Sequence, residues 1–147
     1  SVSFPLHPDW EFLALIPDFD LPTTLARSVL PEQVSRGDAI YNITHGAVVL
    51  KALELGDEKL LRTAMQDRLH QKYRKKLIPD YDKIEALVRT TGAAFCLSGA
   101  GPTLLCITQD QALEEKLAKK LPQITEANWE MLPLHVEFQG AHIIESE

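Results

Sequence analysis

The apolar positions of the chain fall into short continuous runs and into longer stretches with a helical period. Continuous or alternating apolar runs that end at Pro or Gly are typical of strands. The runs that predict strands are Glu11–Ile16, Ala93–Leu97, Leu104–Thr108 and the alternating residues Leu134, Val136 and Phe138.

Stretches with helical spacing lie between these strands. The longest is Gly37–Leu55, where Ile40, Ile43, Ala47, Leu50 and Leu53 recur at that spacing. Thr23 or Thr24 could cap a short helix that stops before Pro31, Gly56-Asp57 separates the long helix from the next, and Pro79 suits the first turn of another. The remaining predicted helices are Glu58–Leu69, Pro79–Gly92 and Gln111–Leu121, and His70–Ile78 reads as basic and irregular.

The order strand, helices, strand, strand, helix, strand predicts an α+β fold. We expect a small antiparallel sheet with helices packed on one face, which resembles a ferredoxin-like split βαβ arrangement with extra helices. The 147 residues contain no repeat and no linker, so we expect residues 1–147 to form a single domain.

Composition narrows the function classes. Hydrophobic residues make up 45% of the chain and charged residues 24%, which is ordinary for a globular protein, and the net charge of -6 makes nucleic acid a poor partner. No window has the roughly 20 apolar residues that span a bilayer, and the start is not a signal peptide, so we expect no membrane partner and a cytoplasmic location. The chain begins without Met, as though cut from something longer.

The two cysteines, Cys96 and Cys106, lie in the two apolar runs on either side of a glycine-containing stretch. If these runs form a hairpin, a disulfide between them is conceivable, but two buried, reduced thiols are the favoured interpretation. The chain has no Cys-x-x-Cys and no His-Glu-x-x-His, so we expect no metal site.

The most informative stretch is Ser98-Gly99-Ala100-Gly101-Pro102-Thr103. Small residues leave the backbone accessible, so that consecutive N–H groups can form an anion-binding concavity. On spacing alone a plain turn between strands is the commoner outcome. The stretch is neither a Walker A loop nor a Rossmann fingerprint, because it lacks Gly-Lys-[Ser/Thr] and a strand follows it.

With the residues before it, this stretch resembles a known family motif. Gly92-Ala93-Ala94-Phe95-Cys96-Leu97-Ser98-Gly99-Ala100-Gly101-Pro102-Thr103 looks like the third conserved motif of the GHMP kinases, which include galactokinases, homoserine kinases, mevalonate kinases and phosphomevalonate kinases. In that family the loop reaches into the active site beside the substrates. The resemblance therefore implies that Ser98, Gly99, Ala100, Gly101 and Thr103 bind substrate.

Two further stretches are similar to homoserine kinases within this superfamily. One is Thr23–Pro31, with an Ala-Arg pair before Leu-Pro, and the other is Asp67–Arg74, with Tyr-Arg at its end. The resemblance implies that Arg27 and Arg74 hold the α-carboxylate of L-homoserine, since a guanidinium meets a carboxylate with two parallel hydrogen bonds. The opening His7-Pro8-Asp9 and the late Gly140–Ile143 also fit.

The resemblance covers only the C-terminal half of such an enzyme. The family's ATP-binding loop, Pro-x-x-x-Gly-Leu-Gly-Ser-Ser, belongs to an N-terminal domain and does not occur in this sequence. The implied reaction transfers the γ-phosphoryl group of ATP, with Mg²⁺, to the hydroxyl of L-homoserine in threonine biosynthesis. We expect this chain to need its own N-terminal kinase domain as a partner, to be inactive alone and to supply no catalytic base, and exposed apolar surface would favour a homodimer.

Alternatives remain at this point. The chain could belong to another GHMP kinase that acts on mevalonate or a sugar, or it could be a regulatory module that binds an amino acid without catalysis. Asn42 and His45 share a helical face, where a surface or core-edge pair is favoured over a substrate-binding one. His70 either orients the Tyr-Arg segment by hydrogen bonding or has no such role, Tyr73 is expected to pack the loop, and neither His135 nor His142 is expected to be catalytic.

Overall fold

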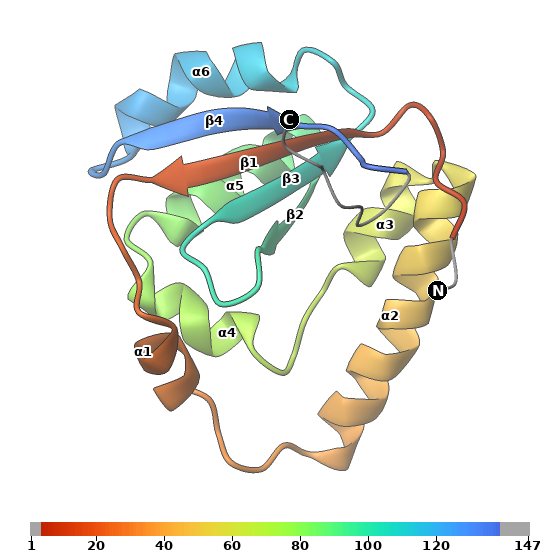
Figure 1. The fold of residues 1–147 in the computed structure, drawn as a ribbon, viewed down its shortest axis with the longest axis vertical. Coiled ribbons are helices and arrows are strands. Elements are labelled where there is room, and N and C mark those ends of the chain that lie inside the picture. Colours follow the sequence, from red (N-terminus) through yellow and green to blue (C-terminus); the bar gives the residue numbers. More distant parts are fainter. Residues whose placement is uncertain (1–3, 139–147) are drawn as a thin grey trace, which may run out of the picture.

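The computed structural model describes residues 4–138 and is built around one four-stranded sheet (Figure 1). The strand order is β2-β3-β1-β4, and every neighbouring pair is antiparallel. The α+β fold that the sequence predicted is therefore confirmed. The strands are β1 (Glu11–Pro17), β2 (Ala94–Leu97), β3 (Leu104–Thr108) and β4 (Trp129–Leu134).

The helices follow the predicted order, with differences at several boundaries. The first begins at Thr23 with Pro22 as N-cap, so neither threonine caps it, and the segment after residue 70 is helical rather than irregular. The N-cap of α5 is Asp80, which places Pro79 just before the helix. The helices are α1 (Thr23–Ser28), α2 (Arg36–Leu55), α3 (Glu58–Ala64), α4 (Gln71–Arg74), the 3₁₀ turn η1 (Lys75–Leu77), α5 (Tyr81–Thr91) and α6 (Leu113–Ile124).

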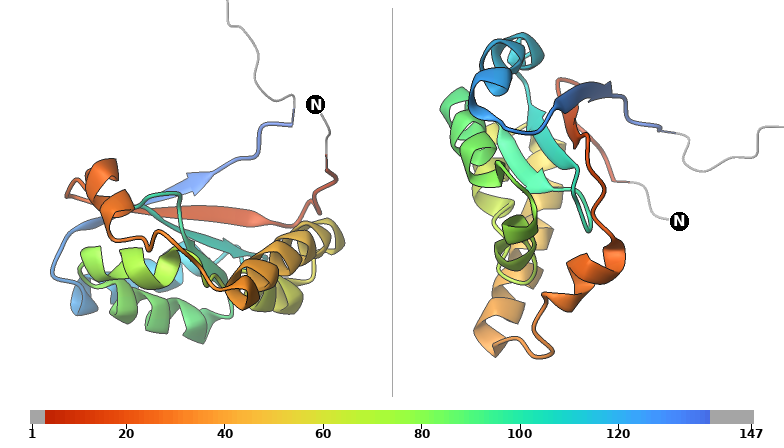
Figure 2. Two further views of the ribbon diagram at one scale, coloured as in Figure 1. Left: turned by 90° about the horizontal axis from the view of Figure 1, so that it is seen from below. Right: turned by 90° about the vertical axis from the view of Figure 1, so that its left-hand side faces the viewer.

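Apolar side chains on the two faces of the sheet form two separate cores. On β3, Leu104 and Cys106 belong to the larger core and Ile107 to the smaller one, as expected from the alternation of side chains along a strand. The larger core is closed by α5 and α6, which lie on the same side of the sheet in Figure 2. The smaller core packs Trp10 against Ala52 of α2 and Leu61 of α3.

The last strand lies earlier than the sequence predicted. Its pairing with β1 runs from Pro17 opposite Trp129 to Phe12 opposite Leu134, so the ladder ends where β1 begins. Val136 and Phe138 follow the strand and are exposed. The sequence pattern missed the true start because Pro133 interrupts it, and an edge strand tolerates a proline.

Part of the apolar stripe of α2, including Ile40 and Ile43, faces away from the rest of the domain, whereas Leu53 packs against the smaller core. A stripe at this spacing ordinarily covers a core. Here Ile40 is 51% exposed and Ile43 is 74% exposed, whereas Asn42 on the opposite side bonds to Asp67. The inward side of α2 is therefore partly polar at Asn42, whereas Val49, Ala52 and Leu53 face the smaller core.

Three further features of the described residues concern the cysteines, potential metal ligands and the length of apolar helices. Both cysteines are free, and the hairpin register pairs Cys96 with Leu105 and Phe95 with Cys106, so the two thiols lie on opposite faces of the sheet. Residues 4–138 contain no cluster of three or more potential metal ligands. Over the same residues, no helix is long and apolar enough to cross a membrane.

Candidate active site

Arg74 joins the three segments that the sequence predicted to form the site. Its Nε donates to the carbonyl oxygen of Ala26 at 3.1 Å, and its Nη1 donates to the carbonyl oxygen of Gly99 at 2.9 Å. These contacts connect α4 with α1 and with the loop between β2 and β3, and Figure 1 shows the three segments together at the lower end of the domain. The short helix α4 places the guanidinium between the other two.

The loop between β2 and β3 is held by its own backbone. Ser98 N–H donates to the carbonyl oxygen of Thr103 and Gly101 N–H donates to that of Ser98, both at 2.9 Å. Gly99 and Gly101 have φ angles of 58° and 84°, which favour glycine. Within residues 4–138, the N–H groups of Gly99 and Ala100 donate to no protein acceptor. They lie beside a cationic guanidinium and are free to meet an anion.

The two glycines serve different purposes. A Cβ on Gly101 would lie 3.0 Å from Leu97 Cδ1 and 3.2 Å from Ile78 Cδ1, so this glycine lets the loop pack on the core. A Cβ on Gly99 would meet no atom within 4 Å. Gly99 is also exposed, so space is left beside it for a ligand.

The two predicted substrate-binding arginines differ in their surroundings. Arg27 follows Ala26 directly, is exposed, and within the described part of the chain its guanidinium forms no hydrogen bond or ion pair. Arg74 is half-buried, and its Nε and Nη1 are taken by protein acceptors. Its Nη2 has no acceptor among residues 4–138, so the group it can offer a ligand is that one nitrogen rather than the full fork.

A buried carboxylate lies behind Arg74. Asp67, whose side chain is 8% exposed, accepts the backbone N–H groups of His70 and Gln71 at 2.7 Å each and so caps the start of α4. Burial by itself would raise the pKa of Asp67, but these N–H groups and the amide of Asn42 outweigh it and hold the pKa below its usual range. The predicted helix Glu58–Leu69 consequently ends at Ala64, where the chain turns to make this cap.

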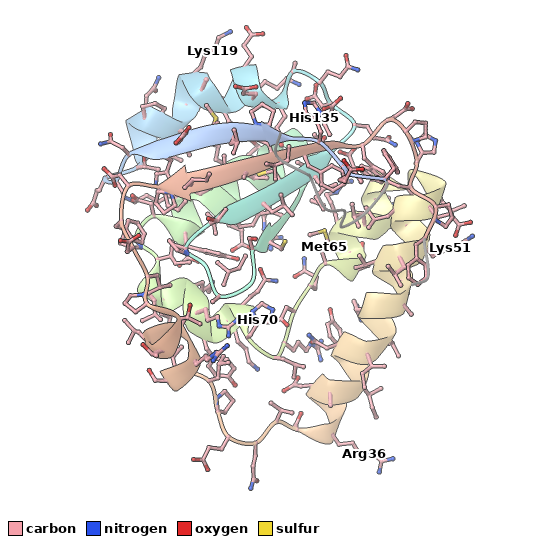
Figure 3. All side chains as sticks on the ribbon, in the orientation of Figure 1. Arg36, Lys51, Met65, His70, Lys119 and His135 are labelled. Atoms are coloured by element: carbon pink, nitrogen blue, oxygen red, sulfur yellow. The ribbon has the colours of Figure 1, made fainter. Side chains whose placement is uncertain are left out.

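His70, labelled in Figure 3, is the residue just before α4 and contacts both Asp67 and Arg74. Its Nε2 is 3.6 Å from Asp67 Oδ1, and its Nδ1 is 3.4 Å from Arg74 Nη1. Burial lowers the pKa of His70, and the charge of Arg74 acts in the same direction against the opposing charge of Asp67. Burial and the charge of Arg74 therefore both favour the neutral form of the ring.

The other polar residues singled out in the sequence have structural surroundings. Asn42 donates to Asp67 at 2.7 Å and accepts the N–H of Arg68 at 2.9 Å, so it fastens α2 to the loop before α4. His45 stacks on Tyr41 with ring centroids 3.6 Å apart and does not contact the β2–β3 loop. His135 is exposed beyond the end of β4. His142 and the stretch Gly140–Ile143 lie outside the described residues.

Sequence reasoning gave no role to Asp67 or Gln71. Gln71 Oε1 accepts the N–H of Leu97 at 2.7 Å, which attaches α4 to the strand that leads into the loop. An Asp shortly before a helical turn is a capping signal, and this signal could have located Asp67. The contact between Gln71 and Leu97 joins positions 26 apart and has no signature in the sequence.

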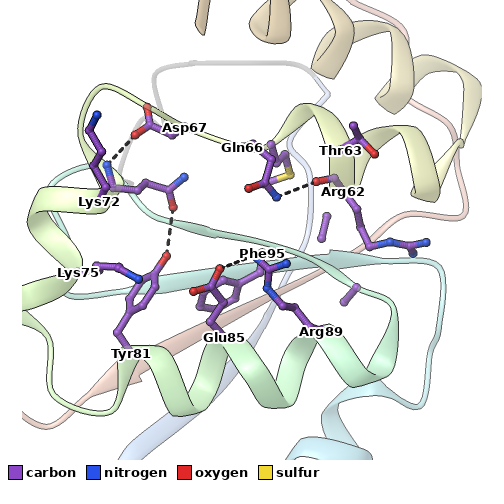
Figure 4. Close-up of a pocket in the computed structure, with 14 residues that line it drawn as sticks. Arg62, Thr63, Gln66, Asp67, Lys72, Lys75, Tyr81, Glu85, Arg89 and Phe95 are labelled. Atoms are coloured by element: carbon purple, nitrogen blue, oxygen red, sulfur yellow. Dashed lines mark hydrogen bonds and ion pairs between the residues drawn. The ribbon is translucent and has the colours of Figure 1, made fainter. Parts of the chain in front are cut away.

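A groove of about 530 Å³ lies beside the free edge of β2, and Asp67 and Gln71 are among the residues that line it. It is bordered by α3 and α5 and lined by residues such as Arg62, Glu85, Arg89 and Phe95 (Figure 4). Arg89 donates to Glu85 at 2.7 Å, and Arg62 bonds to the carbonyl oxygen of Gly92. The groove contains none of the predicted site residues, and its charged side chains already have partners.

Comparisons with known proteins agree on the family. Residues 49–126 match the family described as GHMP kinases C terminal. The chain is 43% identical over 140 residues to the homoserine kinase of Nostoc punctiforme, which covers 93% of this chain and 46% of that protein. It is 41% identical over 138 residues to the homoserine kinase of Caldicellulosiruptor bescii, covering 90% of this chain and 45% of that protein.

A solved structure gives the same answer for the fold. The crystal structure of homoserine kinase from Cytophaga hutchinsonii superposes with a TM-score of 0.85 at 24% identity, and covers 95% of this chain and 45% of that one. The chain thus spans a little under half the length of the relatives it matches. From its sequence match and its fold, this chain belongs to the GHMP kinase family and carries that family's C-terminal domain.

Proposed function

We propose that this chain is the substrate-binding half of a homoserine kinase, which transfers the γ-phosphoryl group of ATP to the side-chain hydroxyl of L-homoserine in threonine biosynthesis. The observation that carries the proposal is the junction at Arg74. One guanidinium bonds to the carbonyl of Ala26, next to Arg27, and to the carbonyl of Gly99 in the loop. The relatives with the highest identity quoted above are homoserine kinases.

The junction suits an amino-acid carboxylate. Arg27 is exposed and offers its whole guanidinium, and Arg74 offers the two N–H groups of Nη2. Both arginines keep their charge at any working pH, and charge-assisted hydrogen bonds to a carboxylate are roughly twice as strong as neutral ones. The loop residues Ser98–Thr103 would then line the site, with the N–H groups of Gly99 and Ala100 facing the ligand.

In addition to a site for the acceptor, phosphoryl transfer requires groups that bind ATP and Mg²⁺. Phosphoryl transfer depends on positioning and on stabilising the charge of the phosphates, and Mg²⁺ with ATP supplies the transferred group and neutralises that charge. We assign their binding mainly to an N-terminal domain outside this chain. The role of the present residues is to hold the acceptor amino acid so that its hydroxyl faces the nucleotide, and no side chain among residues 4–138 is assigned as a catalytic base.

The test is an ADP-release assay on this chain joined to its N-terminal half, with homoserine, mevalonate and galactose as acceptors. Turnover with homoserine alone supports both the activity and the substrate. Turnover with mevalonate or galactose instead would assign the chain to another GHMP kinase. Binding of an amino acid without turnover of any acceptor would favour the regulatory module.

A further inference from the structure

A continuous row of contacts runs from α2 to the candidate site. Asn42 donates to Asp67 Oδ1 at 2.7 Å, the same oxygen lies 3.6 Å from His70 Nε2, and His70 Nδ1 lies 3.4 Å from Arg74 Nη1. The last member donates to Gly99, and so reaches the loop. Each link joins a polar side chain to the next one toward the site.

The neighbours of His70 determine which of its two ring nitrogens carries the proton. A guanidinium nitrogen can only donate, so Nδ1 of His70 must accept from Arg74. In a neutral imidazole the other nitrogen then carries the proton, and Nε2–H faces the carboxylate of Asp67. The anion on one side and the cation on the other therefore select the same tautomer.

The surroundings of Asp67 keep its carboxylate charged and fixed in position. Two backbone N–H groups and the amide of Asn42 donate to it at 2.7 Å, and only 8% of its side chain is exposed. A carboxylate with three donors cannot rotate without leaving one of them unpaired. It therefore gives His70 a fixed partner.

Arg74 depends on this arrangement for its direction. The two N–H groups of Nη1 meet Gly99 and His70, and the N–H of Nε meets Ala26. When all three are bonded, the guanidinium plane is fixed, and Nη2 is the nitrogen of this group that has no acceptor among residues 4–138. Removing the acceptor on His70 leaves one N–H of Nη1 without its partner, so that only the bonds to Ala26 and Gly99 hold the guanidinium.

We propose that Asp67 and His70 are positioning residues for substrate binding: Asp67 holds His70 in its Nε2–H tautomer, and His70 Nδ1 aims the guanidinium of Arg74 at the substrate carboxylate. This inference rests on the proposed function, because it assigns Arg74 a carboxylate ligand. His70 touches neither substrate nor nucleotide in this arrangement. Its effect passes through Arg74.

The test uses the full-length enzyme that contains this chain, with initial rates measured against homoserine and against ATP. His70→Leu removes the acceptor and should raise KM for homoserine about tenfold while KM for ATP stays within about twofold, the size expected for one hydrogen bond to a charged group. His70→Asn places a carbonyl oxygen near the position of Nδ1 and should stay within about threefold of the wild type. Lys72→Met is the matched control: Lys72 lies on the same helix, and its Nζ pairs with Asp38 at 3.7 Å and lies 5.1 Å from the centroid of the Tyr73 ring.

A double-mutant cycle separates positioning from a structural role. In an Arg74→Met background, His70→Leu should cause no further rise in KM for homoserine, and an additive rise would overturn the proposal, as would equal damage from His70→Asn and His70→Leu. Thermal midpoints are measured for every variant. If His70→Leu does not fold, His70→Gln replaces it: its amide lies at the position of Nε2, so it should behave worse than His70→Asn, and equal KM values would overturn the proposal.

The same kinetic measurements distinguish a failure of the positioning role from a failure of the proposed function. If the wild-type enzyme does not use homoserine, the proposed function fails and the positioning role with it. If the wild type uses homoserine and His70→Leu leaves its KM unchanged, only the positioning role fails.

Discussion

Arg74 Nη1 donates to the carbonyl oxygen of Gly99 at 2.9 Å, across 25 positions of sequence. The same guanidinium bonds Ala26 through Nε at 3.1 Å. A residue that we propose to bind substrate thus also connects α1, α4 and the β2–β3 loop. Its two roles have different consequences, and a comparison with Arg27 can separate them.

Arg74→Ala should affect both stability and substrate binding. The carbonyl groups of Ala26 and Gly99 lose their donor, so the free energy of unfolding should fall by about 1–3 kcal/mol. KM for homoserine in the full-length enzyme should rise strongly, and KM for ATP should change little. Urea unfolding and initial rates measure these two effects. An unchanged KM for homoserine would refute the carboxylate role, whatever happens to stability.

Arg27→Ala should affect substrate binding alone. Its guanidinium is exposed and forms no hydrogen bond or ion pair in the described part of the chain, so the free energy of unfolding should stay within about 0.5 kcal/mol of the wild type. KM for homoserine should rise, because one of the two cationic partners of the carboxylate is lost. A loss of stability as large as that of Arg74→Ala would show that Arg27 braces the domain as well.

Substitutions of the two loop glycines should separate in the same way. Gly99→Ala places a Cβ in open space and costs only the left-handed backbone strain, about 1–2 kcal/mol. Gly101→Ala adds a clash with Leu97 at 3.0 Å, so overpacking should cost a further ~1–3 kcal/mol. Urea unfolding of both variants tests this order. If Gly99→Ala proved the more destabilising, the loop would have to pack differently from the arrangement described above.

The sequence pattern predicts most of the elements, because Pro and Gly mark where they end. It places α2 correctly between Gly37 and Leu55, but the same pattern says nothing about which side of the helix meets the domain. Asn42 faces inward because Asp67 and the N–H of Arg68 need its amide. Such pairings over some 25 positions follow from the tertiary fold and have no local signal.

The candidate site likewise consists of residues that the sequence identified and of contacts that it did not. The family resemblance identified Arg27, Arg74 and the loop Ser98–Thr103, and the structure brings Arg74 into contact with the loop and with the residue next to Arg27. The sequence did not predict that Arg74 offers a ligand only Nη2. The reason is that the acceptors of Nε and of one N–H of Nη1 are backbone carbonyl groups. Every residue has such a group, so no residue type in the sequence marks Ala26 or Gly99 as a partner.

The outward stripe of α2 leads to a prediction about stability. In the 147-residue chain, Ile43→Ser should change the free energy of unfolding by less than about 0.5 kcal/mol, because Ile43 is 74% exposed. Leu61→Ala on the neighbouring helix is the contrast: Leu61 is fully buried, and its loss should cost about 2–5 kcal/mol. A large effect of Ile43→Ser in the full-length protein alone would show that this face is covered there.

The state of His70 gives the domain a pH dependence of known sign. Burial, together with the charge of Arg74 and against that of Asp67, lowers the pKa of His70 from its ordinary value of 6.5. The unfolded chain therefore takes up this proton at a higher pH than the folded one, so the stabilising contribution is complete above pH 6.5 and is lost as pH falls through the pKa of the folded state. His70→Asn cannot titrate, and the difference in free energy of unfolding between wild type and variant should shift in favour of the variant between pH 7.5 and pH 5, as measured by urea unfolding at each pH. Asp67 should not contribute to this change, since its own pKa lies below 3.8 and its effect belongs to more acidic solutions. A difference that stays constant across the range, or moves in favour of the wild type on acidification, would mean that His70 is not held neutral between Asp67 and Arg74.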